Sequence, residues 1–65
     1  MSFSDNLKNL RKLQKLDQST LAKSLSVSSK TVSHWETGYT EPSIAQLILI
    51  ANFFDISVDE LIDRK

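Results

Sequence analysis

Hydroxyl-bearing side chains, one lysine and one histidine are concentrated in the stretch SSKTVSHWET, residues 28 to 37. Hydroxyl and ammonium groups donate to phosphate oxygens and to base edges, and lysine donates to O6 and N7 of guanine. On a helical wheel one face carries Ser29, Lys30, Ser33, His34 and Thr37, and Ser28 precedes it as a cap. Val32 and Trp35 point the opposite way. Such a small, polar face suits insertion into the major groove of DNA.

The same residues do not form a catalytic or metal site. His34 is the only histidine and there is no cysteine, whereas zinc needs three or four ligands. Ser28, Ser29 and Ser33 lack a base or an oxyanion arrangement. We therefore expect no enzymatic activity, metal or cofactor, and no small-molecule effector site is evident. The alternative to a groove contact for His34 is an ordinary exposed polar residue.

Composition favours a small helical domain. The 65 residues include one Gly and one Pro, and 40% are hydrophobic, which argues against a turn-rich β fold. The net charge is zero, but residues 1–35 carry six basic and two acidic residues, and residues 36–65 carry two basic and six acidic ones. This asymmetry is a hint of nucleic-acid binding, and a dipolar surface without a partner is the alternative. Without a signal peptide or a membrane span, a cytoplasmic protein is expected.

Five helices are predicted over residues 4–15, 17–25, 28–37, 43–54 and 57–62, within a single domain, 1–65. Asp17 and Ser28 are good N-caps, and Gly38 follows the third helix where a left-handed residue is expected. SIAQ and SVDE are capping boxes that begin the last two helices at Ser43 and Ser57. A helix, a short turn and a second helix over residues 17–37 have the spacing of a helix-turn-helix.

The fourth helix is apolar on more than one side. We expect Ile44, Leu47, Ile48 and Ala51 to face the core. Ala45, Leu49 and Phe53 then point elsewhere and, together with Val58 and Ile62, are predicted as dimer contacts, because large apolar residues on an outer face mark interfaces. The alternative is a core that extends further round this helix.

The stretch LDQSTLAKSLSVSSKTVSHWETGYTEPS closely resembles the phage-repressor, Cro and Xre type of helix-turn-helix regulator, and the resemblance continues through LILIANFFDISVDELI. It implies a compact, all-α, five-helix, lambda-repressor-like domain. It also implies that Gln18 bridges a phosphate and the second helix of the motif, and that Arg11 pairs with Glu36. Base edges would be contacted by Ser29, Lys30, Ser33 and His34, and the DNA backbone by Ser28, Thr31, Thr37 and Tyr39.

Three positions depart from this family pattern. Ser26 and Lys15 stand where glycine is common, and a positive φ there would carry a local cost. Asp17 replaces a small polar residue near a phosphate and would repel DNA if left unpaired.

The resulting expectation is a sequence-specific, double-stranded DNA-binding transcriptional regulator. We expect a bacterial, phage or plasmid repressor that binds a pseudo-palindromic operator as a homodimer. The alternative is a helical protein-interaction module, such as an antitoxin-like or antirepressor partner, that keeps the fold without binding DNA.

Overall fold

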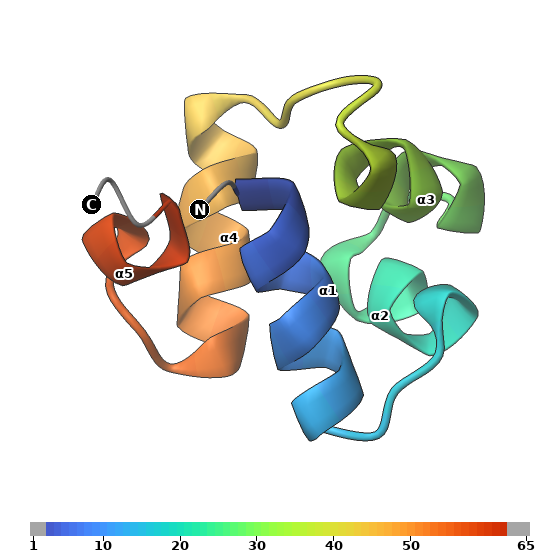
Figure 1. Cartoon of the computed structure of the whole chain (residues 1–65), viewed down its shortest axis with the longest axis horizontal. Helices are drawn as coiled ribbons and strands as arrows, with labels where there is room; N and C mark the ends of the chain where they lie inside the picture. Colours follow the sequence, from blue (N-terminus) through green and yellow to red (C-terminus); the bar gives the residue numbers. More distant parts are fainter. Residues whose placement is uncertain (1–2, 63–65) are drawn as a thin grey trace.

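The computed structural model describes residues 3–62, which form five α-helices and no strand (Figure 1). The helices are α1 (Phe3–Leu13), α2 (Gln18–Leu25), α3 (Ser29–Thr37), α4 (Ile44–Phe54) and α5 (Val58–Ile62). In Figure 1, α4 and α5 lie on one side, α2 and α3 lie on the other, and α1 lies between them. The all-α, five-helix prediction is confirmed.

The predicted N-caps set where α2 to α5 begin. Asp17, Ser28 and Ser43 have extended backbone, and each side chain accepts from the backbone N–H three residues on. Both predicted capping boxes are present: the Ser43 N–H donates to Gln46 Oε1 at 2.8 Å, and the Ser57 N–H donates to Glu60 Oε1 at 3.0 Å. Each of these helices therefore starts one residue after its cap.

The first four helices end in the same way, on a residue with left-handed backbone. These residues are Lys15, Ser26, Gly38 and Asp55, with φ between 58° and 79°. The N–H of the following residue then donates to a carbonyl five positions back, which is the Schellman motif; the donors are Leu16, Val27, Tyr39 and Ile56. Leu16, Val27 and Ile56 pack against the core, whereas Tyr39 is 76% exposed.

Glycine at two of these helix ends is expected to stabilise the protein. Lys15 and Ser26 adopt φ of 58° and 60°, where a Cβ is strained. Ser26→Gly and Lys15→Gly should each raise the free energy of unfolding by about 0.5–1 kcal/mol, measured by thermal unfolding. Ser24→Gly is the matched control inside α2 and should lower stability by up to ~1 kcal/mol. Destabilisation by Ser26→Gly would contradict the left-handed assignment.

The core draws on all five helices. Its buried apolar residues are Leu7, Leu21, Ala22, Leu25, Val32, Trp35, Ile50, Ala51, Phe54 and Leu61. In α2 the inward residues are Leu21, Ala22 and Leu25. Because α3 contributes Val32 and Trp35, its opposite face is left on the surface.

The prediction for the buried face of α4 is partly wrong. Ala51 is buried and Leu47 is partly buried, but Ile44 is 77% exposed and Ile48 is 48% exposed. Ile50 and Phe54 are buried instead. Only Gln46 and Asn52 are polar in this eleven-residue helix, so apolar periodicity does not mark one face. The buried stripe is rotated away from the expected one, and a wide apolar surface is exposed.

Candidate nucleic-acid interface

The segment from α2 to α3 forms a helix-turn-helix. The turn consists of residues 26–28, in which Ser26 reverses the chain and Ser28 caps α3. Val32, Trp35 and Glu36 are the buried residues of α3. The helix is thereby anchored along one side, and it lies at the edge of the molecule beside α2 (Figure 1).

The outer face of α3 is polar and accessible, although not uniformly. Ser28, Ser29, Lys30 and Thr37 are exposed, as is Tyr39 just beyond the helix. Thr31, Ser33 and His34 are partly buried, and so is Gln18 at the start of α2. Lys30 is the only residue on this face with a full charge, and the charge is positive. The predicted DNA-contacting residues therefore all retain some exposure, and they lie on α3, at its two ends and at the start of α2.

Some hydroxyls of this face are already engaged. Ser28 Oγ accepts from the Thr31 N–H at 3.1 Å and lies 2.9 Å from Thr31 Oγ1. Thr37 Oγ1 donates to the His34 carbonyl at 3.2 Å. Among residues 3–62, the side chains of Ser29, Lys30 and Ser33 have no hydrogen-bond partner within the protein. These three are the side chains most available to a ligand.

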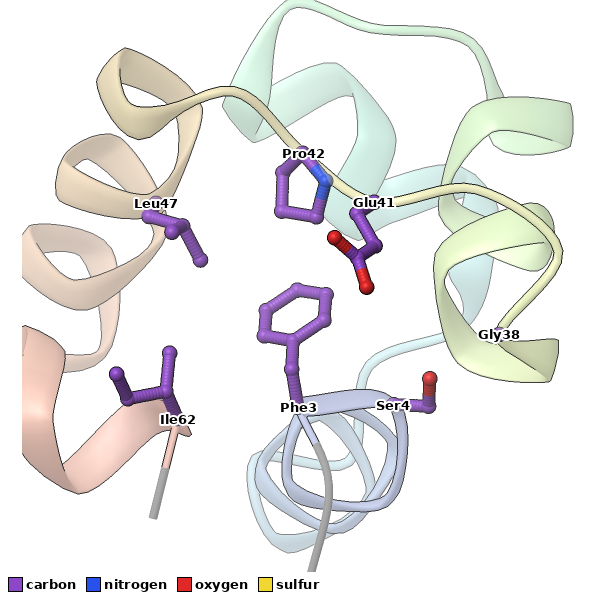
Figure 2. Close-up of a pocket in the computed structure, with 7 residues that line it drawn as sticks. All are labelled: Phe3, Ser4, Gly38, Glu41, Pro42, Leu47 and Ile62. Carbon is purple, nitrogen blue, oxygen red and sulfur yellow. The ribbon is translucent and has the colours of Figure 1, made fainter. Parts of the chain in front are cut away.

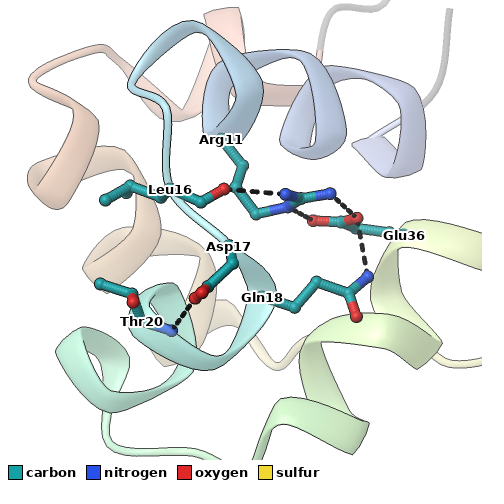
Figure 3. Close-up of polar contacts among 6 residues, drawn as sticks. All are labelled: Arg11, Leu16, Asp17, Gln18, Thr20 and Glu36. Carbon is teal, nitrogen blue, oxygen red and sulfur yellow. Dashed lines mark hydrogen bonds and ion pairs between the residues drawn. The ribbon is translucent and has the colours of Figure 1, made fainter.

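A buried ion pair fixes α3 against α1 (Figure 3). Arg11 Nε donates to Glu36 Oε2 at 2.7 Å, and Arg11 Nη2 donates to Glu36 Oε1 at 3.0 Å. A third donor of Arg11 reaches the Leu16 carbonyl at 2.8 Å. The Glu36 side chain is only 1% exposed. The pair that the resemblance implies is thus present, and it ties α1, the α1–α2 loop and α3 together.

Gln18 joins this pair. Its Nε2 donates to Glu36 Oε1 at 3.1 Å, so the first residue of α2 is held against the inner side of α3. Hydrogen bonding of Gln18 to the buried carboxylate was not visible in the sequence. The amide oxygen of Gln18 makes no hydrogen bond within residues 3–62 and is left for a ligand.

The carboxylates near this surface are held in their ionised form. Burial opposes the ionisation of Glu36, but hydrogen bonds from Arg11 and Gln18 outweigh it, so the pKa of Glu36 is lowered. The hydrogen bonds that Arg11 donates to Glu36 in turn raise the pKa of Arg11. The backbone hydrogen bond from Thr20 lowers the pKa of Asp17. Asp17 therefore keeps its negative charge beside Gln18.

The rings of His34 and Tyr39 touch at the C-terminal end of α3. Their centroids are 4.7 Å apart and their planes are inclined by 57°. Both residues are predicted DNA contacts, but the contact between their rings was not predicted. A signal was available, because the Schellman motif at Gly38 brings the residue after the glycine next to the one five positions earlier.

A pocket of about 460 Å³ lies behind α3, between the start of α1, the α3–α4 loop, α4 and α5 (Figure 2). It is lined by Phe3, Ser4, Gly38, Glu41, Pro42, Leu47 and Ile62. The Phe3 ring stands near its centre in Figure 2 and also packs edge-to-face on Trp35, with centroids 6.4 Å apart. One hydroxyl and one carboxylate in an apolar lining do not form a nucleophile–base arrangement.

The described residues contain no group of three or more His, Cys, Asp or Glu side chains placed to hold a metal ion. No helix within residues 3–62 has the length and apolarity needed to cross a membrane.

Known DNA-binding regulators have a similar structure or sequence. The P22 c2 repressor in complex with a synthetic operator superposes with a TM-score of 0.92 and 28% identity, over 100% of this chain and 98% of that one. The transcriptional activator BcrR of Enterococcus faecalis is 39% identical over 65 residues. The Fe(II) form of the enzyme HppE contains a similar domain, with a TM-score of 0.84 and 34% identity over 92% of this chain and 32% of that chain.

Fold and surface together define a DNA-binding helix-turn-helix domain of the Xre, Cro and phage-repressor type. The helix-turn-helix family model matches residues 7–61, and the chain belongs to this family. The chain spans 32% of the length of BcrR, although it matches that relative along all of its own length.

Proposed function

We propose that this protein is a sequence-specific transcriptional regulator that inserts α3 into the major groove of an operator. The observation that carries the proposal is the outer face of α3, where the side chains of Ser29, Lys30 and Ser33 make no hydrogen bond with residues 3–62. The P22 c2 repressor, with 28% identity over the whole chain, is a repressor with an operator bound. Its likeness supports the same mode of binding here.

In this proposal Ser29, Lys30, Ser33 and His34 contact base edges, because they lie on the outer side of α3. The amide oxygen of Gln18 is an acceptor and cannot bind a phosphate oxygen. One N–H of Nε2 already donates to Glu36, so the phosphate contact uses the second N–H. Ser28, Thr31, Thr37 and Tyr39 border the groove and contact the DNA backbone. Because a single Lys provides the full charge on this face, few phosphates are neutralised and the salt dependence is modest.

In this proposal the bound protein represses transcription by excluding RNA polymerase from the promoter. A protein bound over a promoter blocks RNA polymerase without any chemical step, so the proposed role is non-enzymatic. BcrR is an activator, and the P22 c2 protein is a repressor. We favour repression because the P22 c2 repressor is similar along the whole of this chain and 98% of its own, and because exclusion of polymerase needs no more than a DNA-binding domain.

Ser29→Ala and Lys30→Ala test the groove assignment. Each should reduce discrimination at its own base position by ~1–3 kcal/mol, because one bidentate or charged contact has this magnitude. Measured affinities for all single-base variants of a selected operator give the result. The control is Lys23→Ala, on an exposed residue of α2 outside the predicted set, which should leave base discrimination unchanged. Unchanged discrimination in both α3 variants would refute the assignment.

We further propose that the protein binds as a homodimer to two half-sites about one helical turn, ~34 Å, apart. The surface is the exposed side of α4, with Ala45, Leu49 and Phe53. Of the other two predicted contacts, Val58 is partly buried against the core and Ile62 lines the pocket, so they can contribute only their exposed parts. The exposed Ile44 and Ile48 widen the surface. The helix carries no charged residue, and an apolar helix face of this extent is typical of an interface.

Leu49→Glu is expected to dissociate the dimer while the fold is kept, because Leu49 is 54% exposed. Sedimentation should report a monomer, and affinity for a two-half-site operator should fall by about 10²-fold or more because the second half-site no longer binds intramolecularly. Leu13→Glu is the matched control, since Leu13 is 77% exposed on α1 and should leave both measurements unchanged. A Leu49→Glu protein that remains dimeric would exclude this surface.

A further inference from the structure

The four Schellman motifs of this fold differ in one respect. After α1, α2 and α4, the residue that follows the left-handed position is Leu16, Val27 or Ile56, and each packs against the core. After α3 it is Tyr39, which is 76% exposed. The contact that usually closes a Schellman motif on the apolar side is therefore made on the outer surface here.

The partner of Tyr39 is His34. The Tyr39 N–H donates to the His34 carbonyl at 2.9 Å, and the two rings lie 4.7 Å apart between centroids, inclined by 57°. Gly38, with φ of 79°, turns the chain back so that the phenol ring lies against the imidazole at a tilt of 57°. The backbone hydrogen bonds fix the start of the Tyr39 side chain, so the ring contact restricts the conformations open to His34.

His34 lies one helical turn after Lys30 on the outer side of α3, and it is partly buried while Lys30 is exposed. A neutral imidazole has one donor and one acceptor nitrogen. It can discriminate between base edges only when its ring is held in one orientation. The Tyr39 ring, 4.7 Å from the imidazole between centroids, provides this restraint.

We propose that Tyr39 is a positioning residue for His34, so that the two rings act as one specificity element at the C-terminal end of α3. The inference rests on the proposed function and assigns different roles to His34 and Tyr39. His34 contacts the base, and Tyr39 sets the orientation of the imidazole through ring contact. The phenol hydroxyl has a separate role at the DNA backbone.

The free protein provides a first test. His34 is the only histidine, so its imidazole protons form one assignable set of NMR signals. Tyr39→Phe keeps the ring and should leave these signals close to their wild-type positions, whereas Tyr39→Ala should shift them because the ring current is lost. Identical imidazole shifts in wild type and Tyr39→Ala would overturn the ring contact, whether or not the protein binds DNA.

Base discrimination provides the second test, with a selected operator and each of its single-base variants. Tyr39→Ala should reduce discrimination about three- to tenfold at the same base pair that His34→Ala affects, as expected from partial loss of one base contact. The double variant His34→Ala/Tyr39→Ala should lose no more base discrimination than His34→Ala alone, because both changes remove the same specificity element. Tyr39→Phe should keep the preference while its overall affinity falls.

The outcomes separate this inference from the proposed function. Equal weakening of all sequences by Tyr39→Ala, or fully additive losses in the double variant, would overturn the positioning role while DNA binding stands. A wild-type protein that discriminates no operator base would refute the proposed function itself, and the imidazole role with it. Circular dichroism checks folding, which the exposed position of Tyr39 should preserve.

Discussion

Replacing Arg11 with methionine is expected to destabilise the protein by about 3–5 kcal/mol, because it leaves the Glu36 carboxylate buried without its cation. Glu36 would keep only the hydrogen bond from Gln18. A domain of 65 residues has little stability in reserve, so a large unfolded fraction should be present at room temperature. Urea denaturation followed by circular dichroism measures the loss.

The double variant Arg11→Met/Glu36→Leu is the control. Apolar residues of similar volume often replace a buried pair at little cost, so the double variant should recover much of the stability lost in Arg11→Met. A single variant within about 1 kcal/mol of wild type, or a double variant less stable than the single one, would contradict the structural role of the pair.

The same pair makes stability depend on pH. The pKa of Glu36 in the folded protein is lowered, so the unfolded chain binds a proton at higher pH than the folded protein does. The contribution of Glu36 is complete above the ordinary carboxyl pKa and is lost as the pH falls toward the folded value. Unfolding curves in acid should show this loss in the wild type and a weaker one in Arg11→Met. The pKa of Asp17 is also lowered, so Asp17 adds a loss of stability in acid to both the wild type and Arg11→Met.

Trp35→Ala should destabilise the protein by about 3–5 kcal/mol, as expected for an aromatic residue removed from a core. Trp35 is 2% exposed and contacts the Phe3 ring, so its loss opens a cavity between α1 and α3. DNA binding should fall with the folded fraction. Because Trp35 is the only tryptophan, unfolding must be followed by circular dichroism.

Lys30→Ala, on the opposite side of the same helix, is the matched comparison. Lys30 is exposed, so its removal should change the free energy of unfolding by less than about 0.5 kcal/mol and should act on DNA binding alone. Comparable destabilisation by the two substitutions would show that α3 does not divide into an inner anchoring face and an outer binding face.

The local parts of the fold could be predicted from the sequence because their causes are local. Asp17, Ser28, Ser43 and Ser57 are caps by their own side-chain chemistry, and each occupies its predicted place. The inward face of α3 was also predictable, because Val32 and Trp35 stand against a run of small polar residues.

The rest depends on packing between elements. Because α4 has apolar residues on every side, its own sequence does not decide which side is buried. Packing against the neighbouring helices decides it and leaves Ile44 and Ile48 exposed. Lys15 and Ser26 stand where the family commonly has glycine, and both have the left-handed backbone that this predicts. Asp55 also has left-handed backbone, but no sequence feature predicted it. The bond from Gln18 to Glu36 joins residues 18 positions apart and forms only because α2 packs against α3.

Selection of bound duplexes from a random DNA pool at about physiological salt tests the central claim most directly. The proposed operator binding predicts enrichment of an inverted repeat whose half-sites lie about one helical turn apart, ~34 Å. Enrichment should be lost with Lys30→Ala at the base pair that this residue contacts. A folded wild-type protein that enriches no sequence would contradict operator recognition, and it would leave the apolar face of α4 as the surface through which the protein acts.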